Sequence, residues 1–423
     1  MSDLKTQVLA AASACKTASV LLRQLDTKSK NDALLAIADS LEGNINKIVE
    51  ANKVDVDNAI AKNTDPAIVD RLTLNEKRIL DIANAVRDVV KLPDPIGEVI
   101  REFTLPNGLN VQQVRVPLGV VAMIYEARPN VTVDAAVLVL KSGSAALLRG
   151  SGSAYNTNLV LTEIMRDAIS KVGLPKDAIV LVPGTDHESV KYVMTARGLV
   201  DVIIPRGGAG LIESVVLGST VPVIETGIGN CHLYIDEFAD LDKALKIAIN
   251  AKTQRVSVCN ALETILVHEK VASEFLPKLM QAFKDKGVTV HGSAEYEKTA
   301  QECGTNFEPV TDADWASEYY SLDIAAGVVD SIDEAIEHIQ KWSTGHTEAI
   351  VTEDKNQAQK FVSAIDSAAV MVNASTRFTD GGEFGFGAEI GISTQKLHAR
   401  GPMGLAEITS FKYVVTGDGQ IRG

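Results

Sequence analysis

Hydrophobic residues in the first ninety positions recur with the period of an α-helix. Residues 3–60 and 70–91 carry apolar side chains three or four positions apart, with charged residues between them. The pattern changes at 97–116, where two β-rich segments flank Pro106-Asn107-Gly108. An Asn-Gly pair between such segments is typical of a β-hairpin. Polar side chains on both strands predict that this hairpin stands away from the main core.

From residue 117 the pattern alternates between short apolar runs and amphipathic segments. The run at 119–125 is continuously apolar, which is typical of a buried strand in a parallel sheet. Further strands are predicted at 145–149, 179–182, 200–204 and 221–224, and helices at 131–141, 157–172, 187–197 and 209–217. This alternation predicts a parallel sheet covered by helices, which binds ligands at the carboxyl ends of its strands.

Residues 240–370 repeat the alternation and predict a second α/β unit. Its strands are predicted at 263–268, 288–290, 325–329 and 349–351, and its helices at 240–251, 270–285, 332–341 and 355–365. Residues 374–404 are rich in Gly, Ser, Thr and Phe, and they include a long loop at 378–387. Long loops in compact domains are usually functional or disordered. A last strand is predicted at 408–415.

Composition excludes several classes of function. The 423 residues carry a net charge of -14, whereas a nucleic-acid-binding surface needs a basic stripe. The four cysteines are widely spaced and form no Cys-x-x-Cys pair, which indicates a reducing compartment rather than a disulfide framework. No apolar run approaches the roughly 18 residues of a membrane span, and the polar N-terminus lacks a signal-peptide core. We therefore expect a cytoplasmic protein that acts on small molecules, with no nucleic-acid or membrane partner.

Cys259 is the most reactive candidate in the chain. It lies in a loop between a predicted helix and a predicted strand, with Arg255 four residues upstream and Lys252 seven. The thiolate is the nucleophilic form of cysteine, and nearby cations favour it. The alternative is that Cys259 is a small buried hydrophobic residue.

Three other loops have a chemical and a structural interpretation each. The segment 206–210 follows a predicted strand with three glycines, so its backbone N–H groups either approach a phosphate or form a tight turn. Asn130 opens a predicted helix, where it either caps the helix or directs its amide at a developing oxyanion. The basic loop 396–404 either binds an anion or is a solvated surface loop.

Familiar metal and nucleotide motifs are absent from the sequence. Neither a G-x-G-x-x-G nor a Walker segment occurs. His268-Glu269 lacks the second histidine of zinc proteases, and Cys231-His232 lacks a partner pair. No Gly-x-Ser-x-Gly elbow is present. We therefore expect neither a metal site nor a serine hydrolase.

Several blocks taken together resemble the aldehyde dehydrogenase superfamily. They cover essentially the whole chain, and some exceed ten residues. The resemblance is closest to the branch that reduces the acyl phosphate L-glutamyl 5-phosphate. The matching blocks are 116–134, 204–210, 227–232, 250–255 with Cys259-Asn260, 373–382 and 393–405.

The resemblance implies an α/β fold of two parallel-sheet domains with a small oligomerisation hairpin. Residues 1–96 and 117–238 are then expected to form a cofactor-binding domain, and residues 239–395 a catalytic domain. The segments 97–116 and 405–423 are expected to form the oligomerisation hairpin and its C-terminal strand.

The same resemblance implies roles for individual residues. Cys259 is the expected nucleophile, and Asn130 with the backbone N–H of Cys259 is the expected oxyanion site. Arg149 stands in the place of a lysine that holds the adenosine ribose of the cofactor. Further cofactor contacts are expected at Ser151, Arg206, Gly207, Gly208, Gly210 and Glu318. Substrate anions are expected to meet Arg255, Arg377, His398 and Arg400.

The implied reaction is the NADPH-dependent reduction of L-glutamyl 5-phosphate to glutamate 5-semialdehyde and phosphate through a cysteine thioester, the second step of proline synthesis. NADP(H) is expected over NAD(H), because Gly150, Ser151 and Gly152 follow Arg149 where NAD-preferring relatives carry an acid. The implied partners are a second copy of the chain, as a homodimer or a higher homo-oligomer, and a complex with glutamate 5-kinase.

Two alternatives stay open at this point. The first is a hydrolytic aldehyde dehydrogenase, in which water attacks the thioester and Glu225 serves as the general base. A phosphate-releasing reductase must instead exclude water, which argues against that role for Glu225. The second alternative is a catalytically silent homologue that acts as an oligomeric binding partner. The chain also departs from the family at Val256, where a proline commonly follows Arg255.

Overall fold

The computed structural model describes residues 3–422, and the chain divides into two compact units. Unit 1 contains the chain up to Glu225, residues 386–391 and the chain from Met403 onward. Unit 2 contains residues 226–385 and 392–402. Each unit is built on a parallel sheet with helices, so the α/β class expected from the sequence is confirmed.

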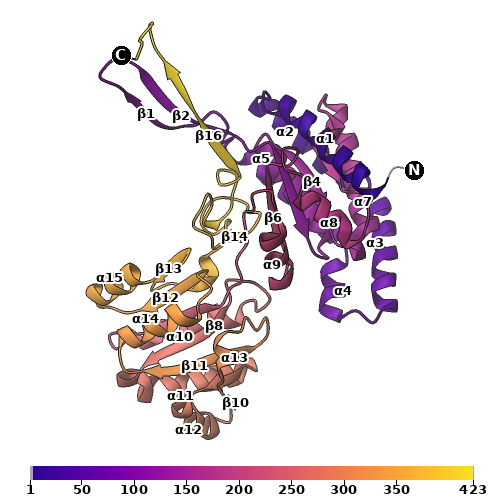
Figure 1. Ribbon diagram of the computed structural model, residues 1–423. Helices are drawn as coiled ribbons and strands as arrows, with labels where there is room; N and C mark the ends of the chain where they lie inside the picture. The colour runs from indigo at the N-terminus through magenta and orange to yellow at the C-terminus, as the bar shows by residue number, and fades with distance from the viewer. Residues whose placement is uncertain (1–2, 423) are drawn as a thin grey trace. The chain divides into compact units, whose positions relative to one another are not determined.

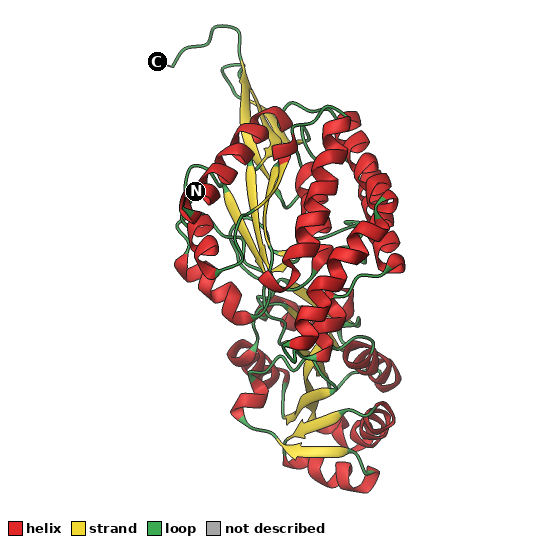
Figure 2. Cartoon of the chain, turned by 90° about the vertical axis from the view of Figure 1, so that its right-hand side faces the viewer, coloured by secondary structure: helices red, strands yellow, loops and turns green. Residues whose placement is uncertain are grey.

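The core of unit 1 is a four-stranded parallel sheet in the order β5-β4-β3-β6. Its central strands are buried along their whole length, as the continuous apolar run predicted. Helices lie on both sides of the strands (Figure 2). The strands are β3 (Val120–Tyr125), β4 (Ala145–Arg149), β5 (Ile179–Leu181) and β6 (Val202–Arg206). The helices are α1 (Leu4–Leu22), α2 (Thr27–Gly43), α3 (Ile45–Ala61), α4 (Pro66–Leu72), α5 (Glu76–Lys91), α6 (Pro129–Lys141), α7 (Tyr155–Lys171), α8 (His187–Met194) and α9 (Ala209–Gly218), with short turns η1 (Gly152–Ala154) and η2 (Lys176–Ala178).

A second, antiparallel sheet of unit 1 has the order β1-β2-β16. The predicted hairpin forms β1 (Val99–Thr104) and β2 (Asn110–Pro117), and the last strand, β16 (Thr409–Thr416), pairs with β2 along its whole length. Every residue of β1 is exposed. Figure 1 shows this sheet extending away from the helices of unit 1, as its polar pattern predicted.

Unit 2 contains a seven-stranded parallel sheet in the order β10-β9-β11-β8-β7-β12-β13. Its central strands β7 and β8 are completely buried. The strands are β7 (Cys231–Ile235), β8 (Leu262–His268), β9 (Thr289–Gly292), β10 (Asn306–Pro309), β11 (Asp323–Val329), β12 (Thr347–Val351) and β13 (Ala369–Val372), and a separate pair is β14 (Ile392–Ser393) with β15 (Gly401–Pro402). The helices are α10 (Leu241–Thr253), α11 (Glu269–Lys286), α12 (Ala294–Cys303), α13 (Asp312–Trp315), α14 (Ile332–Trp342) and α15 (Lys355–Ala364), with the turn η3 (Thr376–Phe378).

The boundary between the units differs from the expected one. The sequence suggested a change of domain after residue 238, whereas the first segment of unit 1 ends at Glu225. The reason is β7, which was not predicted and which hydrogen-bonds between β8 and β12 in the sheet of unit 2. The strand expected at 221–224 is reduced to a single bridge between Ile203 and Val223. Among residues 3–422, no helix combines the length and the apolarity needed to cross a lipid bilayer.

Candidate functional site

The candidate residues divide between the two units. Asn130, Arg149, Ser151 and the 206–210 turn belong to unit 1, and Cys259, Arg255, Glu318, Arg377, His398 and Arg400 belong to unit 2.

In unit 1 the candidates gather at the carboxyl edge of the parallel sheet. Tyr125 ends β3 opposite Arg206, which ends β6, and Arg149 ends β4 next to Ile124. Asn130, Ser151 and the glycine turn follow these strand ends directly. This is the edge at which open parallel sheets bind ligands.

The N-terminus of α9 holds a carboxylate of the protein itself. The backbone N–H of Gly208 donates to Glu126 Oε1 over 3.2 Å. A Cβ atom on Gly207 would lie 2.6 Å from the Glu126 carboxyl carbon, so a larger residue here would require the Glu126 side chain to move. Gly210, by contrast, has open space where a Cβ would be. The backbone N–H at this helix end therefore donates to an anionic oxygen, as N–H groups at helix N-termini commonly do.

Asn130 is the second residue of α6, and Arg128, not Asn130, occupies the capping position. The Asn130 amide donates to Asp134 Oδ2 over 3.0 Å, one helical turn further on. Burial raises the pKa of Asp134 to about 6, against the opposing effects of Asn130 and Arg206. Asp134 thus fixes one N–H of the Asn130 amide and leaves the second for another acceptor.

Arg149 is 6% exposed, and its guanidinium donates to groups of the protein. Nε donates to Ser189 Oγ over 2.8 Å, one Nη to the Asp186 carbonyl over 2.8 Å, and the other Nη to the Gly150 carbonyl. Burial lowers its pKa. Ser151 accepts the Ser153 N–H at the start of η1. Arg149 is therefore a rigidly positioned cation at the strand end.

In unit 2 the candidates lie at the opposite, amino edge of the sheet. Cys259 precedes β8, Glu318 precedes β11, and Cys231 is the first residue of β7. The general expectation for parallel sheets therefore does not hold in unit 2. Its carboxyl edge has a cavity of about 480 Å³ whose lining includes Glu269, Glu295, Asp330 and Glu334, which suits no anionic ligand.

The backbone beneath Cys259 is packed against Gly229. A Cβ atom on Gly229 would lie 1.5 Å from the Cys259 carbonyl oxygen, so no side chain fits. Cys231 Sγ donates to the same carbonyl oxygen over 3.2 Å. Burial and neighbouring acidic groups raise the pKa of Cys231 well above its usual value, so this second thiol stays protonated. Cys259 itself is partly exposed.

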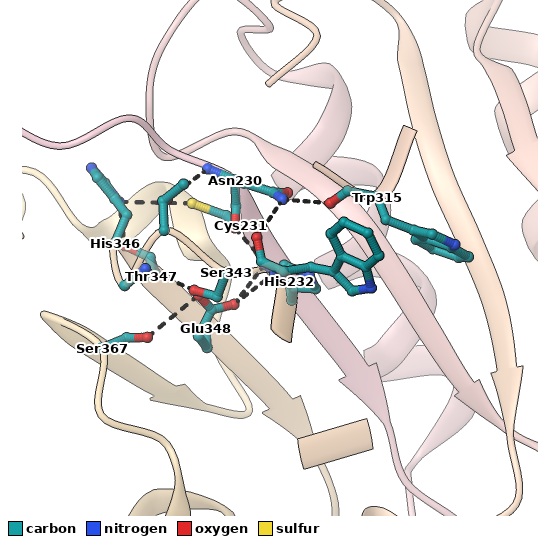
Figure 3. Close-up of polar contacts among 12 residues, drawn as sticks. Asn230, Cys231, His232, Trp315, Ser343, His346, Thr347, Glu348 and Ser367 are labelled. Carbon is teal, nitrogen blue, oxygen red and sulfur yellow. Dashed lines mark hydrogen bonds and ion pairs between the residues drawn. The ribbon is translucent and has the colours of Figure 1, made fainter. Parts of the chain in front are cut away.

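A buried network fixes the segment that carries Gly229 (Figure 3). Asn230 Nδ2 donates to the carbonyls of Trp315 and Trp342, and its backbone N–H donates to Thr344 Oγ1. The Glu348 carboxylate accepts a hydrogen bond from the His232 backbone N–H over 2.8 Å and lies 3.1 Å from Nδ1 of the His232 ring. The chain is therefore fixed directly after Gly229.

Glu318 joins the same surface from the loop before β11. Its Oε1 accepts the Gly229 N–H over 3.0 Å, and its Oε2 accepts the Tyr320 hydroxyl over 2.6 Å. Burial raises the pKa of Glu318. Tyr320 has a φ of 56°, in the left-handed region that non-glycine residues rarely enter.

Asn260 connects Cys259 to the glycine-rich loop. Its Nδ2 donates to the Thr379 carbonyl over 2.9 Å and to the Arg377 carbonyl over 3.3 Å, and its own carbonyl accepts Thr376 Oγ1 over 2.7 Å. Arg377 Nε donates to Gln254 Oε1 over 2.7 Å. Burial lowers the Arg377 pKa, and Asp380, Arg255 and Cys259 lie close enough to influence it. Arg377 therefore lies within electrostatic range of both Cys259 and Arg255.

The remaining cations behave differently from the expectation. Arg400 donates to the Asp366 side chain over 2.8 Å and to its carbonyl over 2.6 Å, and Lys396 pairs with the same carboxylate. These pairings lower the Asp366 pKa to about 2. His398, at the exposed tip of the loop, has a φ of 70°. Lys252 does not serve as a solvent-accessible cation for Cys259, because it is buried against Glu263 at 2.6 Å.

Several residues of this arrangement escaped the sequence analysis. Asp134 lies four residues after Asn130, a spacing that marks neighbours on one helix face and could have revealed the pair. Gly229, Glu263 and Tyr320 contact residues that are distant in the sequence, so no local spacing of residues predicts their contacts. Within residues 3–422, no group of three or more His, Cys, Asp or Glu side chains is arranged to hold a metal ion.

Comparison with known proteins places the chain in a family. The model of the aldehyde dehydrogenase family matches residues 2–301. The chain is 58% identical to the gamma-glutamyl phosphate reductase of Thermobifida fusca over 100% of both chains, and 55% identical to that of Carboxydothermus hydrogenoformans over 99% of this chain and 100% of the relative. A crystal structure of gamma-glutamyl phosphate reductase from Thermotoga maritima superimposes with a TM-score of 0.95 at 48% identity, covering 99% of this chain and 100% of the other. The chain belongs to the aldehyde dehydrogenase family, among relatives named gamma-glutamyl phosphate reductase.

Proposed function

We propose that this protein reduces L-glutamyl 5-phosphate with NADPH to L-glutamate 5-semialdehyde and phosphate, as the second step of proline synthesis in the cytoplasm. The observation that carries the proposal is the surrounding of Cys259. A partly exposed thiol lies four residues after Arg255 and close enough to Arg377 to influence its pKa, and a glycine packs directly against its backbone. The names of the full-length relatives supply the substrate.

The unit 1 edge has groups that suit a dinucleotide phosphate. The backbone N–H of Gly208 at the α9 N-terminus already donates to a carboxylate oxygen of Glu126, which supports an anion site there. Glu126 has to give way for a pyrophosphate to take this place. Gly207, Gly208 and Arg206 would hold the pyrophosphate, and Arg149 with Ser151 the adenosine ribose and its 2′-phosphate. Gly210 would only provide space, and Glu318 would hold the second ribose. When bound, NADPH supplies the hydride.

The residues of the chain account for the remaining chemistry. The Cys259 thiolate attacks the acyl carbon, the bond from that carbon to the phosphate oxygen breaks, and a thioester forms. Arg255 and Arg377 balance the charge of the departing phosphate and of the substrate carboxylate. The second N–H of Asn130 and the backbone N–H of Cys259 stabilise each tetrahedral oxyanion. After reduction the thiolate leaves and the aldehyde is released.

We also propose that the chain works as a homodimer joined through the β1-β2-β16 sheet. One face of β16 presents Phe411, Tyr413 and Val415, which are at least half exposed, at alternate positions. A short three-stranded sheet with such a face is stabilised when another surface covers it.

The decisive experiment is the oxidative assay with glutamate 5-semialdehyde. We expect NADP⁺ reduction that requires inorganic phosphate, that falls at least tenfold with NAD⁺, and that disappears in Cys259→Ser while cofactor binding persists. Turnover without phosphate would instead favour a hydrolytic aldehyde dehydrogenase. Retention of a tenth of the activity in Cys259→Ser would remove Cys259 from the mechanism.

A further inference from the structure

Two buried charged residues close the base of the loop that carries Cys259. Lys252 lies in the last turn of α10, and Glu263 is the second residue of β8. Their Nζ and Oε2 atoms are 2.6 Å apart, and neither side chain is exposed. The pair therefore joins the two ends of the segment 253–262, which contains Arg255, Cys259 and Asn260.

Glu263 also contacts the loop before β11. The Tyr320 backbone N–H lies close enough to the Glu263 carboxylate to lower its pKa. The Tyr320 hydroxyl donates to Glu318, whose other oxygen accepts the Gly229 N–H. Gly229 is the residue packed against the Cys259 carbonyl. A continuous series of contacts thus runs from the buried pair to the backbone beneath the thiol.

The conformation of Tyr320 indicates that this series is under constraint. A tyrosine with a φ of 56° is held there only when surrounding contacts fix it. Glu263 lies next to its backbone, and Glu318 accepts its hydroxyl. Loss of the Glu263 carboxylate would release one of these contacts.

A buried ion pair is a poor source of stability, since desolvation offsets most of its attraction. Burial raises the Glu263 pKa to about 7, against the effect of Lys252, and lowers the Lys252 pKa. Glu318 faces Glu263, while Asp323 and Cys231 face Lys252 and the Tyr319 ring lies 5.7 Å from its Nζ. A pair of apolar residues would fill the same volume more favourably, so stability alone does not account for these two residues.

We propose that Lys252 and Glu263 are positioning residues, which set the Cys259 loop and, through Tyr320 and Glu318, the backbone surface under the thiol. The proposal rests on the catalytic role of Cys259 in the proposed function. It is independent of which acyl group the thiol attacks.

The test compares the reactivity of Cys259 with the stability of the fold in the double variant Lys252→Met/Glu263→Leu. The rate of Cys259 alkylation by iodoacetamide is followed by peptide mass spectrometry, beside kcat, KM and the thermal midpoint. We expect a midpoint close to that of the unmodified protein, an alkylation rate and a kcat at least tenfold lower, and a KM changed by less than twofold. A folded double variant with alkylation and kcat within twofold of the unmodified protein would overturn the proposal.

A single variant and a control complete the test. Glu263→Gln keeps the side-chain volume, so it tests the carboxylate even when the double variant fails to fold. We expect Cys259 alkylation to be at least fivefold slower in Glu263→Gln than in the unmodified protein. An unchanged alkylation rate would overturn the proposal. Lys30→Met removes one partner of another buried pair, Lys30–Asp94 at 2.5 Å in unit 1. Lys30→Met should lower the thermal midpoint and leave the Cys259 alkylation rate within twofold of that of the unmodified protein. If Lys30→Met slowed alkylation as much as the Lys252 and Glu263 variants do, the effect would be one of general destabilisation and would count against the proposal.

Alkylation separates this proposal from the proposed function. A slower alkylation in the double variant supports the positioning role even when the protein shows no phosphate-dependent activity with glutamate semialdehyde. That second result would show that the substrate is wrong, and not that the pair lacks its role.

Discussion

At Cys259 the chemistry depends on neighbours that are not themselves reactive. Gly229 provides the space against which the Cys259 carbonyl packs, and Asn260 holds the loop that carries Arg377. The loop follows the C-terminus of α10, which is the negative end of a helix dipole, so the helix gives no help to a thiolate. Positive charge has to come from arginine side chains.

We expect Gly229→Ala to disable the protein. The new Cβ would lie 1.5 Å from the Cys259 carbonyl oxygen, so the backbone of one segment must move. Overpacking of this kind typically costs about 1–3 kcal/mol, and we also expect at least a hundredfold loss of kcat, because the thiol moves with its backbone. Gly43→Ala is the control, since nothing lies within 4 Å of its Cβ position. Thermal unfolding and kinetics that match the control would show that the segments are more loosely packed than described.

Asp134→Asn should change the pH dependence of stability. The Asp134 pKa is raised to about 6 in the folded protein, so folding favours the protonated carboxyl and the protein loses stability as the pH rises from about 4 to about 6. Asparagine stays neutral, and the variant should therefore gain several degrees in thermal midpoint at pH 8 and little at pH 4.5. Asp167→Asn is a control of opposite sign, because Lys176 lowers the Asp167 pKa. An equal shift of the Asp134→Asn midpoint at both pH values would contradict this account.

At the scale of elements, β16 determines which edge of the β1-β2 hairpin is paired. It pairs with β2 from Pro117 to Asn110, whereas β1 on the other side of β2 is entirely exposed. The side chains of Phe411, Tyr413 and Val415 point to one face of the strand, because successive residues alternate.

Tyr413→Glu/Val415→Glu should convert the proposed dimer into a monomer without unfolding either sheet. Two charges on the apolar face oppose its burial against a second copy. Sedimentation velocity gives the assembly state, and circular dichroism reports the fold. Lys412→Glu on the opposite face is the matched control and should stay dimeric. A double variant that still sediments as a dimer would remove this face from the interface.

The elements that the sequence predicted well are those with a strong local pattern. The apolar run at 119–125 became β3, and the Asn-Gly hairpin became β1 and β2. β7 was missed because it is five residues long and begins with Cys231 and His232, which do not read as an apolar strand. β10 was missed because it is a short, largely exposed edge strand.

The candidate site likewise contains residues that the sequence could predict and residues that it could not. Cys259 could be named from its loop and Arg377 from the family resemblance, whereas the residues proposed to position them could not be named. Glu263 meets Lys252 only after α10 and β8 are in place, and Gly229 meets Cys259 only after β7 and β8 pair. Arg400 was expected to bind substrate, but its bonds to Asp366 give it a structural partner that the sequence did not reveal.

At the scale of the whole molecule, the order of segments along the chain differs from their grouping in space. Unit 2 is formed by one long segment, 226–385, and one short one, whereas unit 1 needs its first 225 residues, residues 386–391 and the chain from Met403 onward. The protein carries an acidic net charge of -14, whereas Arg255 and Arg377 lie in the loops around the candidate site. An anionic substrate of the proposed kind would therefore be attracted by local charge and not by the molecule as a whole.

The pairing of β16 with β2 has a consequence for synthesis on the ribosome. β2 is translated almost three hundred positions before its partner strand β16. Throughout that interval the nascent chain displays an unsatisfied strand edge beside apolar side chains, which is the kind of surface that recruits chaperones or promotes aggregation. Polar residues on the hairpin suit this interval, because they keep the unpaired edge hydrated until β16 has been translated.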